Sequence, residues 1–289
     1  MRGAAAAGHD QPVMPRPRTS DAVAAYLLER IFEGSLSAGQ RVNLDTLATR
    51  LGVGRDSVRE GLAPLERDGL VRVVHHRGVF VAPFDAGTIR EAFDLYGLLT
   101  ARVFRAAADG VAAHGAPELV AALAAQDEVL AACTDVDEFA AAAAQFHRVA
   151  VVAVAGPRLR AMLRSFGGLV PAATRLSIVE AMAEERCALH ALFATVRGGD
   201  AGAAAAVATD HAVLTADNAI RELRRRGVLD GPVDDLAERG EHLELVRRLD
   251  ERASGPVEHH GWDADVARVA QVRLVDSSAR PVPAQRWAG

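Results

Sequence analysis

Hydrophobic residues follow two different patterns in the two halves of the chain. Between about residues 19 and 83, helix-like spacing of apolar residues gives way to short runs of β-branched residues. From Thr88 to about Gly227, apolar residues recur at helical spacing with no alternating strand pattern, interrupted at points such as Gly156-Pro157 and Pro171. The sequence therefore predicts a mainly α protein, in which a winged helix-turn-helix is followed by an all-α bundle of six or seven helices.

Residues 44 to 51 predict a short helix with one buried face. Four apolar residues, from Leu44 to Leu51, fall at i, i+3, i+4 and i+7. Asn43 suits the N-cap because its side chain can accept hydrogen bonds from the first free amides, and Gly52 supplies the left-handed residue that often ends a helix. A second helix opens at residue 54 or 55. This spacing is typical of a helix-turn-helix.

The second helix presents arginines at its N-terminal end, where a recognition helix meets base edges. Val58, Leu62 and Leu65 form its apolar stripe, whereas Arg55 and Arg59 lie off that stripe and share a face. A guanidinium is well shaped for bidentate contact with O6 and N7 of guanine. Two solvated arginines on an ordinary helix would show the same spacing.

A hairpin with a basic turn is predicted directly after this helix. Gly69 ends the helix, and residues 70–74 and 79–81 form short runs that favour strands. The turn between them is His75-His76-Arg77-Gly78. Arg77 and Gly78 would let side chain and backbone approach a phosphate or the minor groove. Helix, turn, helix and basic hairpin in this order predict a winged domain that binds double-stranded DNA.

The chain divides into five segments. Residues 1–18 are expected to form a disordered arm, 19–83 the DNA-binding domain, 84–87 a linker, 88–227 the helical domain, and 228–289 a partly disordered C-terminal extension. The DNA-binding domain begins with a helix from Asp21 to Glu33 that Ser20 could cap. The extension contains an amphipathic segment, 233–249, and a stretch, 266–275, that fits a strand or a helix.

Composition limits where DNA affinity can come from. With a net charge of −5 and a pI near 6.1, the whole surface is not basic, so DNA must be held by a local patch. Cys133 and Cys187 are the only cysteines of the 289 residues, which predicts buried thiols in a reducing cytoplasm rather than a disulfide framework. No signal peptide or membrane span is expected.

The stretch from about Ala22 to Pro83 resembles the DNA-binding domain of GntR-type bacterial transcription regulators. The resemblance is carried by Gly39, Arg41, the run LDTLATRLGVGRDSVREGLAPLERDGLV from Leu44 to Val71, Arg77, Gly78 and Val81. In such proteins the arginines corresponding to Arg55 and Arg59 contact the operator, and the wing glycine corresponds to Gly78. The contact set expected here is Arg41, Arg55, Asp56, Ser57, Arg59, His76, Arg77 and Gly78.

Asp45 departs from this pattern. Some members of the family place a further DNA-contacting arginine at the start of the first motif helix, where this chain has Asp45. That contact is therefore expected to be absent, and an acid at this position would repel phosphate.

The helical half is similar to the FCD effector domain of the FadR branch of these regulators. The similarity is carried by Asp94-Leu95-Tyr96, by Phe146-His147, by Arg197-Gly198-Gly199-Asp200, and by His211. Such domains commonly bind a divalent metal through one aspartate and three histidines, and a small carboxylate then coordinates the metal. Zinc or nickel is the ion that such a ligand set suits.

Several residues of that metal site are replaced in this chain. His147 and His211 match the first and last histidines, but Ala143 stands where the aspartate is expected. Leu189 occupies the middle histidine position, with His190 one residue away, and one residue turns a side chain by about 100° on a helix.

The resemblance thus implies a site with only part of its ligands. The effector arginine of the family would fall near Leu99 and is also absent. The candidate effector pocket contains His147, Arg175, His190 and His211, of which His147 and His211 are the candidate metal ligands. A domain that keeps the bundle but has changed or lost its ligand is the alternative, as is a surface salt bridge for Arg175.

The sequence predicts a DNA-binding transcription regulator, with repression favoured over activation. It is expected to act as a homodimer whose operator affinity changes when a small molecule, such as a carboxylate, binds the helical domain. A regulator or DNA-architectural protein with a non-sensing helical domain is one alternative, and a helical metalloenzyme is a more distant one. No catalytic residue is assigned, because none of the common catalytic motifs occurs in the sequence.

Overall fold

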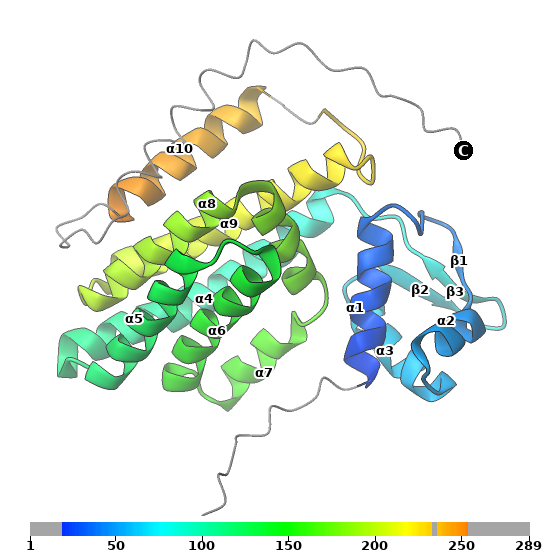
Figure 1. Ribbon diagram of the computed structural model, residues 1–289, viewed down its shortest axis with the longest axis horizontal. Coiled ribbons are helices and arrows are strands. Elements are labelled where there is room, and N and C mark those ends of the chain that lie inside the picture. The colour runs from blue at the N-terminus through cyan, green and yellow to red at the C-terminus, as the bar shows by residue number, and fades with distance from the viewer. Residues whose placement is uncertain (1–18, 233–235, 254–289) are drawn as a thin grey trace, which may run out of the picture.

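The computed structural model describes residues 19–232 and 236–253, which fold into two adjoining units (Figure 1). The winged unit contains α1 (Thr19–Phe32), β1 (Arg41–Val42), α2 (Leu44–Leu51), α3 (Arg55–Arg67), β2 (Val71–Val74) and β3 (Gly78–Val81). The bundle contains α4 (Ala86–His114), α5 (Pro117–Ala132), α6 (Val136–Val154), α7 (Pro157–Ser165), α8 (Leu169–Arg197) and α9 (Ala201–Arg225). The predictions of a mainly α fold, an N-terminal winged helix-turn-helix and a following helical bundle are confirmed.

A further helix, α10 (Leu236–Ala253), lies against α8 and α9 (Figure 1). It overlaps the amphipathic segment that the sequence predicts at 233–249. The expected arm at 1–18 and the stretch at 266–275 lie outside the described residues. Among the described helices, none is both long and apolar enough to cross a membrane.

The caps of α2 are those that the sequence predicts. The Asn43 side chain accepts hydrogen bonds from the amides of Asp45 and Thr46, each at 3.1 Å. Gly52 ends the helix in the left-handed region, with φ of 65°. α3 then begins at Arg55 and buries Val58, Leu62 and Leu65, as predicted from its apolar stripe. Local sequence therefore fixes both ends of α2 and the start of the recognition helix.

The first helix differs from its predicted bounds. It begins at Thr19 instead of Asp21, so Ser20 lies within the first turn and the prediction that Ser20 caps the helix is wrong. α1 packs against α3 at Gly61, where a Cβ would lie 2.6 Å from the carbonyl oxygen of Ser20. Close packing of these two helices therefore requires a residue without a side chain, glycine, at position 61.

The wing is a three-stranded antiparallel sheet in the order β1-β3-β2. Val71 pairs with Val81 and Val74 pairs with Gly78, which gives the hairpin its predicted turn. Strand β1, in which Arg41 pairs with Phe80, was not predicted, because two residues are too few to show an alternating pattern.

The centre of the bundle is formed by α4, α8 and α9. α4 and α9 pack closely at Gly97, where a Cβ would lie only 2.9 Å from the Cβ of Ala212. The predicted break at Pro171 is wrong, since Pro171 lies in the first turn of α8, where no amide hydrogen bond is lost. The 29-residue α8 instead changes direction at Ala181, whose φ is −152° and ψ 59°.

The two units meet where the recognition helix ends. Asp68, the C-cap of α3, accepts a hydrogen bond from the backbone amide of Leu169 at 2.9 Å. Leu169 is the first residue of α8, so this carboxylate caps a helix of the other unit. Arg67 also donates a hydrogen bond to the carbonyl of Ser165 at the end of α7. The recognition helix and α8 are therefore joined directly.

Candidate DNA interface and effector site

The predicted base-reading residues lie exposed at the N-terminal end of α3. Arg55 is the first residue of the helix, and Arg55, Asp56 and Arg59 are all exposed, whereas Ser57 is half-buried. The buried residues of α3 begin at Val58, so Arg55 and Asp56 precede them at the exposed end of the helix. The N-terminal end of α3 is therefore free to enter a groove of DNA.

Arg55 has a partner that the sequence analysis did not predict. Its Nε lies 2.6 Å from Oδ1 of Asp45, in the first turn of α2. Both side chains remain open to solvent, at 72% and 65% exposure. The acid that was expected only to repel phosphate is thus in contact with a predicted base-reading arginine.

A second arginine lies against the wing. The Arg41 side chain covers Gly78, where a Cβ would lie 3.0 Å from Nε of Arg41. At the tip, His76 has a positive φ of 56° and its ring lies 3.8 Å from that of His75. Arg41, His76 and Arg77 are exposed, and they give the wing a basic surface beside Gly78.

The interior of the bundle brings two predicted residues together. His147 of α6 and His211 of α9 stack with ring centroids 5.7 Å apart and an interplanar angle of 26°. Nδ1 of His147 is buried and has no hydrogen-bond partner among the described residues. Burial, with a smaller effect of the nearby His211, lowers the pKa of His147 from 6.5 to about 3, so its ring is neutral.

A buried carboxylate holds the other histidine. Nε2 of His211 lies 2.7 Å from Oε2 of Glu185 on α8, and the Ser177 hydroxyl donates to the same carboxylate. Tyr96 of α4 completes the surroundings, with its ring centroid 6.4 Å from that of His147. Burial raises the pKa of Tyr96 to about 12. We call Tyr96, His147, Ser177, Glu185 and His211 the interior cluster.

The other two predicted pocket residues lie elsewhere. Nδ1 of His190 is 2.9 Å from Oδ2 of Asp127 on α5, so His190 is turned away from the interior cluster. Arg175 pairs with Asp137 at 2.6 Å on the surface, which is the alternative that the sequence left open. The placement of His190 and Arg175 in the pocket is therefore corrected.

The residues present do not fit the divalent ion that the fold family implies. Ala143 and Leu189, at two of the four ligand positions, are buried in the apolar core. The imidazoles of His147 and His211 stack, and the Nε2 of His211 is already bonded to Glu185. Across residues 19–232 and 236–253, no group of three or more possible ligand residues could hold a metal. Zinc or nickel thus lacks a ligand set here.

Sequence reasoning missed the acid of the interior cluster, although a signal was present. Glu185 lies four residues before Leu189 and so on the same face of α8. Its role depends on the facing helix, which places His211 opposite. Asp68 was missed for a similar reason, because a residue after a helix reveals nothing about a helix 101 positions later in the chain.

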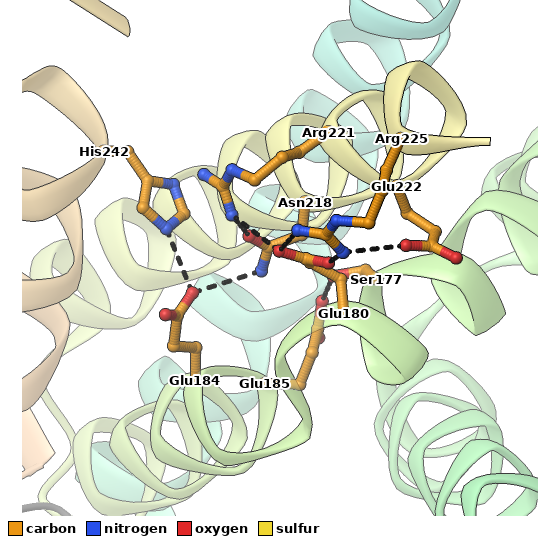
Figure 2. Close-up of polar contacts among 9 residues, drawn as sticks. All are labelled: Ser177, Glu180, Glu184, Glu185, Asn218, Arg221, Glu222, Arg225 and His242. Carbon is orange, nitrogen blue, oxygen red and sulfur yellow. Dashed lines mark hydrogen bonds and ion pairs between the residues drawn. The ribbon is translucent and has the colours of Figure 1, made fainter. Parts of the chain in front are cut away.

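A row of acids on α8 ties this helix to α9 and α10 (Figure 2). Glu184, next to Glu185, lies 3.0 Å from Nε2 of His242 on α10 and 3.3 Å from Nδ2 of Asn218 on α9. One turn earlier, Glu180 accepts a hydrogen bond of 2.9 Å from Nη2 of Arg225. The segment that carries Glu185 is therefore held from two sides by charged and polar contacts.

These features define a winged-helix DNA-binding protein with a helical partner domain, and comparisons with known proteins agree. The family described as bacterial regulatory proteins, gntR family, matches residues 19–81, and the FCD domain matches residues 91–214. An uncharacterized HTH-type transcriptional regulator of Mycobacterium tuberculosis is 32% identical over 222 residues, which cover 74% of this chain and 86% of that protein.

Among solved structures, E. coli McbR/YncC has a TM-score of 0.51 at 19% sequence identity and shares the fold. The similarity covers 68% of this chain and 95% of that one. The chain is a DNA-binding transcription regulator whose C-terminal domain is of the ligand-sensing FCD type. It belongs to the gntR family of bacterial regulatory proteins and carries an FCD domain.

The neutral His147 predicts a pH dependence of stability. The unfolded chain takes up a proton on this residue below about pH 6.5, whereas the folded chain does so only near pH 3. Between these values the unfolded state binds more protons, so the free energy of unfolding falls as pH falls. From pH 7.5 to pH 5 this single group should cost about 1 to 2 kcal/mol, measured by urea unfolding.

His147→Phe should remove that part of the loss, while replacement of the exposed His114 by Gln should leave it in place. Equal losses in wild type and His147→Phe between the two pH values would contradict a neutral buried imidazole.

Proposed function

We propose that this regulator is a homodimeric repressor whose recognition helices read the two halves of a palindromic operator. The observation that carries this proposal is the exposed pair Arg55 and Arg59 at the N-terminal end of α3, beside a basic wing. One recognition helix reads only a few base pairs, so two copies are needed for adequate specificity. Because it regulates transcription, we propose that it acts in the cytoplasm, and we assign it no catalytic residue.

The proposed effector site is the interior cluster. Buried polar atoms are nearly always hydrogen-bonded, so the unpartnered Nδ1 of His147 is the position where a ligand would gain most. A carboxylate, the effector class expected from the resemblance, would meet the carboxylate of Glu185 there, and Arg175 lies on the surface. A small uncharged molecule with a hydrogen-bonding group beside His147 therefore fits the cluster better.

A regulator whose helical domain no longer senses a ligand is the second candidate. It is favoured by the loss of ligand residues at Ala143 and Leu189. The two candidates predict different results for operator binding. A sensing domain changes operator affinity when its ligand binds, whereas a non-sensing domain leaves that affinity unchanged with every metabolite that the products of the regulated genes act on.

The proposed signal passes along α8. Glu185 of the interior cluster lies on the segment after the bend at Ala181, and Leu169 at the start of the same helix is capped by Asp68 of the recognition helix. A ligand that moves α8 would therefore act on α3 through this cap. The size of the effect is limited by the difference in ligand affinity between the two arrangements.

Arg55→Ala and Arg59→Ala should each weaken operator binding by about 1 to 3 kcal/mol if both arginines contact bases. Binding would be measured by fluorescence anisotropy on an operator selected from genomic fragments that the wild-type protein retains. Arg158→Ala, at an exposed arginine on α7, is the control and should bind like wild type. If all three variants bind like wild type, α3 is not the recognition helix.

Asp68→Ala should destabilise the first turn of α8, and the same substitution should also change operator affinity. Loss of an N-cap costs about 1 kcal/mol, so hydrogen exchange at the first amides of α8 should rise by roughly fivefold. Asp135→Ala is the matched control, because Asp135 caps α6 in the same way without touching α3. Faster exchange with operator affinity equal to that of the control would show that this contact does not couple the domains.

A further inference from the structure

The outer face of α4 carries an exposed stripe that the bundle does not cover. Leu95 and Leu98 are 50% and 64% exposed, and Leu98 is the most exposed large hydrophobic residue in the described part of the chain. Around Leu98, exposed residues recur every three or four positions from Glu91 to Arg105, so they share one face of the helix. An exposed apolar centre with a charged border is typical of a surface that binds another protein.

The charges on this stripe change sign at Leu98. Glu91 and Asp94 precede it, whereas Arg102 and Arg105 follow it. All four are exposed, and within the described residues the structure shows no ion pair or hydrogen bond for their side chains. The arrangement is therefore self-complementary: the acidic half of one α4 matches the basic half of another.

We propose that this face binds a second copy of the chain, with the two α4 helices antiparallel and the two-fold axis beside Leu98. In that arrangement the acids of each copy lie opposite the arginines of the other, and the two Leu98 side chains meet at the axis. A parallel arrangement would oppose like charges. The proposal rests on the homodimer proposed above and specifies its interface.

The neighbouring helix widens the same surface. Thr209 and Asp217 of α9 contact α4: Gly97 lies against Thr209, and Arg90 pairs with Asp217 at 3.6 Å. Val213 lies midway between them at helical spacing and is 38% exposed. Thr209, Val213 and Asp217 of α9 thus border the edge of α4 that carries Asp94 and Arg105. The proposed interface would include both helices.

Leu98→Glu tests the interface by placing two like charges at the axis. Its dimer should dissociate at least about tenfold more readily than that of wild type in sedimentation equilibrium, because two carboxylates would be buried together. Val152→Glu, at an exposed apolar residue of α6, is the matched control and should leave dissociation unchanged. Circular dichroism and melting temperature verify that both variants are folded.

Charge reversal tests the antiparallel arrangement. Asp94→Arg and Arg105→Asp should each weaken the dimer, whereas the double variant should restore it, since each copy then supplies both reversed partners. A wild-type dimer that is unaffected by Leu98→Glu, or a double variant weaker than both single ones, would overturn this interface alone. A wild-type protein that sediments as a monomer would overturn the homodimer proposal as well.

The Asp45–Arg55 contact lies at the exposed N-terminal end of the recognition helix. The nearest contact of the Asp45 carboxylate is with Nε of Arg55, and among the described residues neither terminal nitrogen of this guanidinium makes a hydrogen bond. Those two nitrogens form the edge that donates to O6 and N7 of guanine. Asp45 therefore contacts the Nε side of the guanidinium, and the terminal nitrogens remain available to a base.

We infer that Asp45 is a positioning residue that directs Arg55 toward a guanine of the operator. This inference rests on the proposed role of Arg55. An exposed ion pair contributes little to stability, so the effect of Asp45 should be seen in base discrimination rather than in folding. Loss of the acid would also remove a repulsion of phosphate, so affinity for non-specific DNA should stay equal or rise.

The test compares Asp45→Ala, Asp45→Asn and Arg55→Ala on the selected operator, on operators in which each guanine pair is replaced in turn, and on non-specific DNA. Asp45→Ala should lose about tenfold of the discrimination at the guanine that Arg55 reads, and Asp45→Asn, which keeps an acceptor oxygen, should recover part of it.

A uniform gain of affinity on all DNA with Asp45→Ala would show that the acid only repels phosphate, which overturns the inference. If Arg55→Ala leaves discrimination unchanged at every guanine, the assignment of Arg55 itself fails, and the role of Asp45 fails with it.

Discussion

The hydrogen bond from the amide of Leu169 to Asp68 joins the recognition helix directly to α8, and the proposed communication between the two units rests on it. The first amides of a helix have no partner within that helix, and α8 has no side-chain cap of its own at Gly168. The carboxylate that fills this need belongs to the end of the recognition helix. The end of α3 is thereby tied to the start of α8, the helix that runs from Leu169 past the bend at Ala181 to Glu185.

The interior cluster shows how a sensing domain can change chemistry while keeping its fold. Apolar residues at positions 143 and 189 remove ligands from the family's metal site, and Glu185 brings a carboxylate from another helix to His211. Leaving a buried carboxylate unpaired is costly, so His211 and Ser177 now stabilise it. The proposed ligand position in this cluster is therefore the unpartnered Nδ1 of the neutral His147, and the proposed ligand is not a metal.

Much of the winged unit could be predicted because its signals are local. The N-cap at Asn43 and the left-handed Gly52 act within a few residues of their position, and the caps in the structure agree with them. Features that depend on distant segments were predicted poorly. A proline usually ends or bends a helix but is tolerated in its first turn, and in the structure α8 begins at Leu169, two residues before Pro171.

The sequence alone was sufficient to predict the class of the protein, the helices and the hairpin of the winged unit, the arginines of the recognition helix and the replacement of metal ligands. Each of these follows from residue type and short-range spacing. Which side chains meet depends on the packing of helices such as α6, α8 and α9, because this packing brings together residues far apart in the chain. His147 and His211 therefore lie together as predicted. His190 instead contacts Asp127, and Glu185 is the residue of α8 that contacts His211.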